Sequence, residues 1–64
     1  MLYTVPEVAK ILKTNSDYVH RLRKSGLLPF IKLGQYKCRK EALEKFLIDH
    51  EGEDLTNPEE IKKL

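Results

Sequence analysis

Basic side chains are concentrated in the first two thirds of this 64-residue chain. Between Lys10 and Lys40 there are nine Lys or Arg residues and a single acidic one, Asp17. Residues 1–48 contain ten basic and four acidic residues, a net charge of +6, whereas residues 49–64 contain two basic and six acidic residues, a net charge of −4. Concentrated positive charge suits a polyanion, because each neutralised phosphate releases counterions. For an arbitrary small protein this charge alone would favour a merely solvated surface. Its position on an apparent helix-turn-helix followed by a short β-hairpin favours a nucleic-acid partner instead.

The residue types that other chemistries need are scarce. Cys38 is the only cysteine, and His20 and His50 lack metal-ligand spacing, so we expect no disulfide and no metal site. No nucleophile–base pair or phosphate-binding loop is present. Apolar runs are short, which predicts neither a membrane span nor a secretory signal. We therefore expect no enzymatic activity, no cofactor, no small-molecule ligand and no membrane partner, and a cytoplasmic location.

The first element that would position the basic residues is a helix beginning near Thr4. Thr4 can cap this helix, Pro6 suits its first turn and Glu7 completes a capping box. Apolar residues then recur at helical spacing. The expected core residues of this helix are Val5, Val8, Ala9, Ile11 and Leu12.

A second helix follows after a turn of about three residues. Asn15 or Ser16 can cap it, Gly26 can end it in a left-handed conformation, and Val19 and Leu22 form its buried stripe. Two helices of about three turns joined in this way make a helix-turn-helix unit. The polar face opposite the stripe is the candidate surface for reading the major groove. This reading face consists of Ser16, Asp17, His20, Arg21 and Lys24.

A short β-hairpin is predicted next, with strands over residues 30–33 and 36–39 and a two-residue turn at Gly34-Gln35. The side chains expected to point inward are Phe30 or Ile31, with Leu33, Tyr36 and Cys38, and those expected to point outward are Lys32, Gln35 and Lys37. A basic hairpin after such a helix is either a wing that contacts phosphates or the minor groove, or a hairpin that only caps the core. We favour the wing.

From Lys40 onward the sequence predicts a third helix. Its inward residues are expected to be Ala42 or Leu43, with Phe46 and Leu47. The fold class is therefore mainly α with a small β-hairpin: a winged helix-turn-helix of order α-α-β-β-α over residues 1–50. Residues 51–64, here called the tail, are acidic, and Thr56 or Asn57 can begin a last short helix through Leu64. The tail either is solvated, faces a partner protein or disfavours binding in a wrong orientation.

The order of these motifs resembles the excisionase-type helix-turn-helix domains, which are relatives of the MerR-type winged helices. The resemblance spans residues 2–48 and rests on residues 2–12, 19–22, 25–29, 32–34 and 36–43. It implies a winged helix with its second helix in the major groove and its wing in the adjacent minor groove. It also implies a small phage or mobile-element protein that bends DNA and directs an integrase towards excision, or else a transcriptional regulator with the same DNA-binding head.

By position, the resemblance assigns DNA contacts to the start of the second helix and to the wing. The helix contacts are Ser16, Asp17, His20 and Arg21, and the wing contacts are Lys32, Gln35 and Lys37. Tyr36 matches an aromatic that supports the wing. The sequence departs from the family pattern at Asp17-Tyr18, where basic or small residues are common, and at Lys13-Thr14, where a glycine is frequent.

The individual side chains suggest more specific roles. Arg21 is the best candidate for a base contact, because a guanidinium can donate to both acceptors of a guanine edge; the alternative is a phosphate contact. Asp17 can accept from a cytosine amino group. Tyr18 either reaches a phosphate or packs at the helix start. Lys24 suits a phosphate, as does Lys37.

Two further arginines have roles that the sequence leaves open. Arg39 serves either DNA or the fold, and Arg23 is expected to pair with an acidic residue of the first or third helix.

The leading function is sequence-specific binding of double-stranded DNA, with a recombinase or further copies of the chain as additional partners. The alternative is a protein-interaction adaptor whose contact strip comprises the tail residues Leu55, Ile61 and Leu64.

Overall fold

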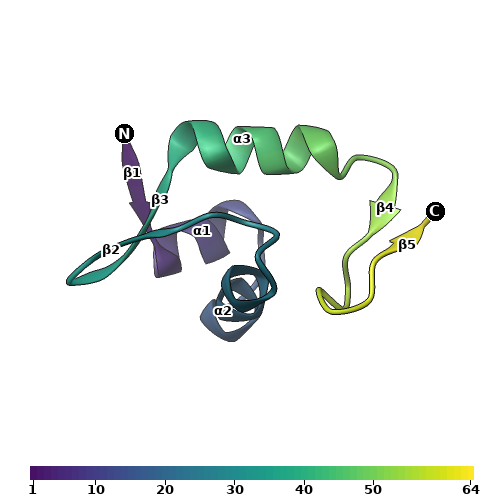
Figure 1. Cartoon of the computed structure of the whole chain (residues 1–64), viewed down its shortest axis with the longest axis horizontal. Coiled ribbons are helices and arrows are strands. Elements are labelled where there is room, and N and C mark those ends of the chain that lie inside the picture. The colour runs from purple at the N-terminus through teal and green to yellow at the C-terminus, as the bar shows by residue number, and fades with distance from the viewer.

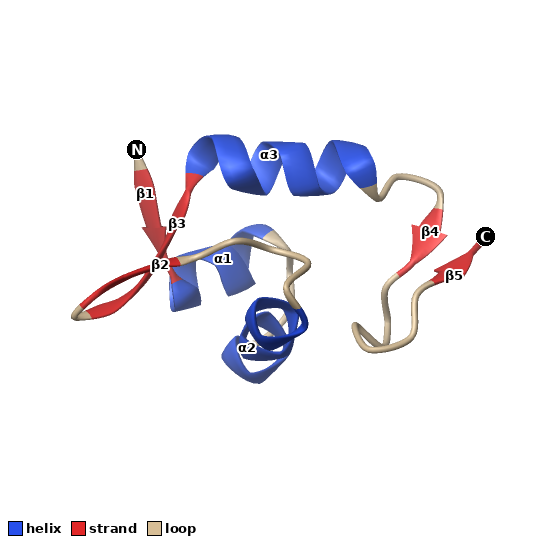
Figure 2. Cartoon of the chain, in the orientation of Figure 1, coloured by secondary structure: helices blue, strands red, loops and turns tan.

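The computed structural model describes all 64 residues, which form three helices, a three-stranded sheet and a C-terminal two-stranded hairpin (Figures 1 and 2). The elements are β1 (Leu2–Thr4), α1 (Val5–Ile11), α2 (Ser16–Ser25), β2 (Ile31–Leu33), β3 (Gln35–Arg39), α3 (Lys40–Asp49), β4 (Glu53–Asp54) and β5 (Lys62–Lys63). The three predicted helices and the hairpin after the second helix are confirmed. β1 was not predicted, because the sequence reads only as the approach to the first helix.

Helix α1 begins at the predicted capping box. The Thr4 hydroxyl accepts from the Glu7 amide at 3.2 Å, and the Glu7 carboxylate accepts from the Thr4 amide at 2.8 Å. These hydrogen bonds lower the pKa of Glu7. The helix has seven residues, so the prediction of about three turns was too long. Lys13, soon after its end, has a φ of 57°, the left-handed conformation that glycine favours and that helices do not continue through.

Helix α2 has the caps that the sequence predicted. The Asn15 side chain accepts from the Tyr18 amide at 2.8 Å, which selects Asn15 over Ser16 as the N-cap. Gly26 ends the helix with a φ of 81°. Together, α1, α2 and their short turn form a helix-turn-helix arrangement.

The sheet has the order β1-β3-β2, with both pairings antiparallel. Leu33 pairs with Gln35, so Gly34 stands alone between β2 and β3 with a φ of 76°. The predicted two-residue turn at Gly34-Gln35 was therefore wrong, because Gln35 already belongs to β3. Lys32 pairs with Tyr36. Paired residues share a face of a sheet, so Lys32 and Tyr36 lie on the same face of the hairpin. The prediction that Lys32 points outward and Tyr36 inward was therefore wrong.

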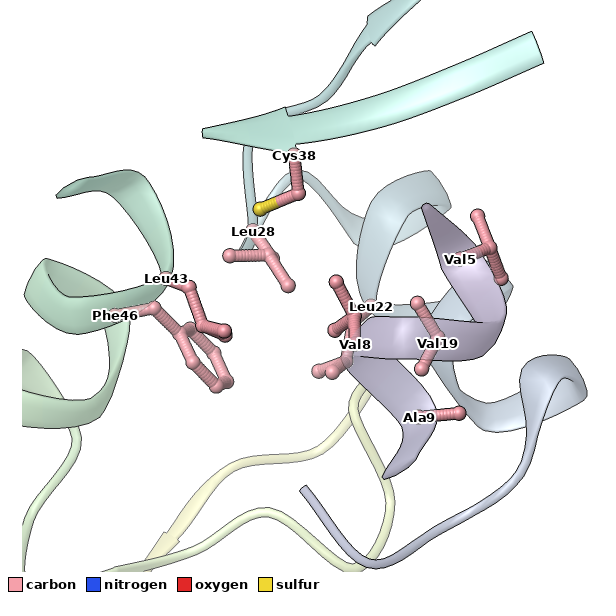
Figure 3. Packing of buried hydrophobic residues seen from close by; sticks show 9 residues of the cluster. All are labelled: Val5, Val8, Ala9, Val19, Leu22, Leu28, Cys38, Leu43 and Phe46. Carbon is pink, nitrogen blue, oxygen red and sulfur yellow. The ribbon is translucent and has the colours of Figure 1, made fainter. Parts of the chain in front are cut away.

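The core lies between the helices and the sheet (Figure 3). It consists of Val5, Val8, Ala9, Val19, Leu22, Leu28, Cys38, Leu43 and Phe46. Burial raises the pKa of the Cys38 thiol, in keeping with a packing role. In Figure 3 Leu43 and Phe46 of α3 point towards Val8 and Leu22, which closes the core from the side of α3.

Three residues that the sequence predicted to point inward are exposed. Ile11 is 45%, Leu33 58% and Leu47 44% exposed. Ile11 is the last residue of the short α1, and Leu33 lies beside the turn of the hairpin. Leu47 is on the outer side of α3, whose buried stripe contains Leu43 and Phe46 at a spacing of three residues. Of the alternative inward residues, Phe30 packs against the core and Ile31 is exposed.

The tail forms no helix, so the predicted C-terminal helix was wrong. β4 and β5 pair antiparallel, with Glu53 opposite Lys63 and Asp54 opposite Lys62, and opposite charges in these positions favour the pairing. The Asp54 carboxylate also accepts from the Thr56 amide at 2.9 Å, a local bond that competes with helix formation. The boundary at residue 50 stays a prediction. None of the helices has the length and apolar character that crossing a membrane requires.

We predict that Leu43→Ala and Leu47→Ala, two substitutions in the same helix, differ strongly in their effect on stability. Leu43 is 3% exposed, so its truncation should lower the free energy of unfolding by about 2–5 kcal/mol. Leu47→Ala should change it by no more than about 0.5 kcal/mol. Urea unfolding followed by circular dichroism measures both. Equal losses for the two variants would contradict the assigned core face of α3.

Candidate nucleic-acid interface

Helix α2 lies on the side of the molecule away from α3, between the β2–β3 hairpin and the C-terminal hairpin (Figure 1). Val19 and Leu22 are completely buried and attach the helix to the core. The opposite face is the predicted reading face. Asp17, Arg21 and Lys24 are exposed there, and Ser16 and His20 are half-buried at its edge. The burial of one stripe therefore determines which polar side chains α2 presents.

One flank of α2 is joined to the β2–β3 hairpin through Tyr36. The guanidinium carbon of Arg23 lies 3.9 Å from the Tyr36 ring centroid, and the Lys32 ammonium lies 5.3 Å from it. His20 contacts the same ring edge-on, with centroids 6.4 Å apart, and its Nδ1 accepts from Arg23 Nε at 3.4 Å. Such a cation–π contact contributes about 0.5–1 kcal/mol at an exposed site. The aromatic ring thus ties the orientation of the hairpin to that of α2.

Arg23 does not have the partner that the sequence predicted. It forms no ion pair with an acidic residue of α1 or α3, and stacks on Tyr36 instead. The supporting role expected of Tyr36 agrees with this geometry. Periodicity alone placed Arg23 near the buried stripe correctly, but it does not show which strand residue faces that position.

The predicted hairpin contacts fall into two groups. Gln35 and His20 line a common hollow of about 260 Å³ beside Tyr36, so the hairpin tip and α2 meet there. Lys37 and Arg39 alternate with Tyr36 and Cys38 along β3 and therefore project from its other face. Arg39 also forms an ion pair with Glu41 at 3.7 Å, at the start of α3. Lys32 shares the face of Tyr36 and lies towards α2, whereas Gln35 alternates onto the face of Lys37 and borders the hollow only at the hairpin tip.

The other flank of α2 is in contact with the tail. Arg21 Nη2 donates to the side-chain oxygen of Asn57 at 2.8 Å and to the Glu59 carboxylate at 2.6 Å. The Tyr18 hydroxyl donates to the backbone carbonyl of Leu55. The Arg21 guanidinium lowers the pKa of Glu59, and the Glu59 carboxylate raises the pKa of Arg21. Partial burial raises the pKa of Tyr18.

Sequence reasoning missed Leu55, Asn57 and Glu59 as neighbours of the reading face. The reversal of charge after residue 48 was a signal that the tail could meet the basic part of the chain. It does not identify which acidic side chain contacts which basic side chain, because that pairing depends on the path of the chain through the hairpin of β4 and β5. Asp17 and Lys24 take part in no ion pair, so they remain the open part of the reading face.

Comparison with known proteins identifies the architecture. No curated protein and no solved structure matches this chain significantly. A family model described as a helix-turn-helix domain matches residues 2–50, which covers β1 to α3 and includes the complete reading face. The comparison thus supports a DNA-binding family that is typically non-enzymatic. The chain belongs to the helix-turn-helix domain family.

Proposed function

We propose that this protein binds double-stranded DNA sequence-specifically, with α2 in the major groove and the β2–β3 hairpin as a wing against the adjacent minor groove. One observation carries the proposal: the second helix of a helix-turn-helix domain buries Val19 and Leu22 and exposes a polar face that bears Arg21 and Lys24. Recognition helices of this class insert that face into the major groove.

Each residue of the reading face has a chemical role in this arrangement. Arg21 donates to a guanine edge or to a phosphate, and Asp17 accepts from a cytosine amino group. Because a carboxylate repels phosphates, Asp17 filters sequences and adds no general affinity. His20, at the edge near the wing, makes a polar or phosphate contact, as does Ser16. Lys24, which is exposed and unpaired, binds a phosphate.

The wing adds contacts that carry little sequence information. Lys32 is held on the side of α2 by its contact with the Tyr36 ring, and Gln35 borders the hollow beside that ring at the hairpin tip. Lys37 and Arg39, on the other face of β3, serve phosphates further along the backbone. This division supports a wing that positions the protein while α2 reads bases.

Within DNA binding, we propose an architectural, excisionase-like role in recombination. The support is the resemblance of residues 2–48 to excisionase-type domains, as set out from the sequence. Such a protein would bend its site, bind as several neighbouring copies and assist an integrase or recombinase. A small transcriptional regulator built on the same DNA-binding head is the alternative that the experiments below separate.

The dependence of binding on salt concentration tests the contacts to phosphates. Binding through about five or six phosphates should give a slope of roughly −5 in a plot of log affinity against log salt concentration. Lys24→Ala should weaken binding to all duplexes alike and reduce this slope by about one. Duplexes selected from a random pool, with fluorescence anisotropy at several salt concentrations, provide the measurement.

Lys45→Ala is the matched control for Lys24→Ala. It removes the same charge from α3, where the Lys45 ammonium pairs with Asp49 at 2.6 Å, away from the reading face. Its salt slope should equal that of the unaltered protein. A reduction of the slope by Lys45→Ala and none by Lys24→Ala would show that DNA lies against another surface. No binding to any duplex at low salt would refute the proposed function and favour the adaptor.

The shape of the bound DNA separates the two proposed roles. If the protein has the architectural role, the selected duplex should be sharply bent and carry several sites in tandem. Circular-permutation gel mobility measures the bend, and titration on the selected duplex counts the bound copies. A single unbent palindromic site would instead indicate the transcriptional regulator.

A further inference from the structure

The reading face is partly occupied by the protein's own tail. Two acceptor oxygens, one from Asn57 and one from Glu59, receive hydrogen bonds from the same nitrogen, Nη2 of Arg21. The 2.6 Å distance to the carboxylate is typical of a charge-assisted bond. Arg21 is also the side chain best suited to a guanine edge, which likewise offers two acceptor atoms. The tail therefore presents Arg21 with the kind of acceptors that DNA would offer.

The tail is anchored beside Arg21 and does not meet it only by chance. Leu55 packs against the core. Pro58 is also buried, and it stands in the sequence between Asn57 and Glu59, the two residues that accept from Arg21. The Tyr18 hydroxyl donates to the carbonyl of Leu55, one helical turn before Arg21 on the same flank of α2. Because these contacts hold the segment in place, Glu59 reaches Arg21 at a high effective concentration.

The charge of the tail opposes DNA at this position. The tail has five acidic and two basic residues, a net charge of −3, whereas residues 1–50 carry +5. With α2 in the major groove, the flank that bears Tyr18 and Arg21 faces a phosphate strand. An anchored Glu59 carboxylate would then lie close to phosphates while competing for the same guanidinium, so both effects act against binding.

We propose that the tail is an intramolecular mask of the recognition helix, in which Asn57 and Glu59 compete with DNA for Arg21. The proposal rests on the proposed DNA-binding function. Binding of DNA would exchange the Glu59–Arg21 pair for a base or phosphate contact and release the Asn57 and Glu59 side chains from Arg21. Arg21 and Glu59 have side chains that are 46% and 55% exposed. An exposed ion pair is weak, so the mask reduces affinity only a few-fold and favours sites that can displace it.

The experiment compares Glu59→Gln with Glu60→Gln in the full chain. Both remove one negative charge, at adjacent positions of the tail. The Glu60 carboxylate, however, pairs with the Lys62 ammonium at 3.6 Å and does not contact Arg21. Glu59→Gln should bind the selected duplex about threefold to fivefold more tightly at low salt, as expected from the loss of one exposed ion pair. Glu60→Gln should change affinity less than about twofold. In an Arg21→Ala background the gain from Glu59→Gln should fall to the less-than-twofold change of Glu60→Gln, since only the general repulsion between the carboxylate and phosphates then remains.

Each other outcome overturns the mask. Equal gains from the two glutamine variants would reduce the effect to general charge, and weaker binding by Glu59→Gln would make the tail a support for Arg21. A gain that persists with Arg21→Ala would exclude the contact as its cause. If the unaltered protein and Glu59→Gln bind the duplex equally well, the mask proposal is refuted and the proposed DNA-binding function stands. If neither binds any duplex, the DNA-binding function fails with it.

Discussion

The arrangement of this molecule depends on the burial of two side chains of α2. Val19 and Leu22 have no exposed surface, and they are the points at which α2 joins a core of only nine residues. Because side chains three and four residues apart share a helix face, the buried pair leaves Asp17 and Lys24 on the opposite side. Any rotation of α2 would expose apolar surface that a 64-residue chain has little other burial to offset. The orientation of the reading face is thus a consequence of packing.

The two flanks of α2 are held by unlike interactions. His20 and Arg23, three residues apart, contact the Tyr36 ring, and Tyr18 and Arg21, also three apart, contact the tail. The ring contact uses polarisable groups and leaves the charge of Arg23 without an anionic partner. The tail contact neutralises Arg21 with a carboxylate. One flank therefore keeps its positive potential for a polyanion, and the other has it partly cancelled.

The parts of the fold that follow from local sequence were predictable. The capping box at Thr4, the cap at Asn15 and the left-handed end at Gly26 depend on neighbouring residues, and each has the predicted geometry. The inward face was predictable where apolar spacing was unambiguous, as at Val19 and Leu22. It failed at Leu47, because α3 has apolar residues on both sides and only packing selects one.

The parts that depend on distant residues were not predictable. β1 needs β3 as its partner, and three residues carry too little pattern to indicate a strand. The tail has a proline after Thr56-Asn57, which is compatible with a helix start, but opposite charges at Glu53–Lys63 and Asp54–Lys62 favour a hairpin instead. The reading face itself was identified from spacing, whereas its contact with Asn57 and Glu59 arises only once that hairpin has formed.

The same hairpin connects stability and binding in one segment. Leu55 packs against the core and Pro58 is buried, so the tail cannot be removed without exposing apolar surface. Asn57 and Glu59 lie between and beside these anchors, with their side chains on Arg21. The contacts to Arg21 are exposed and ionic, so salt or a competing phosphate weakens them. The apolar packing of the anchors is not weakened in this way. The Asn57 and Glu59 side chains can therefore leave Arg21 while Leu55 remains packed on the core.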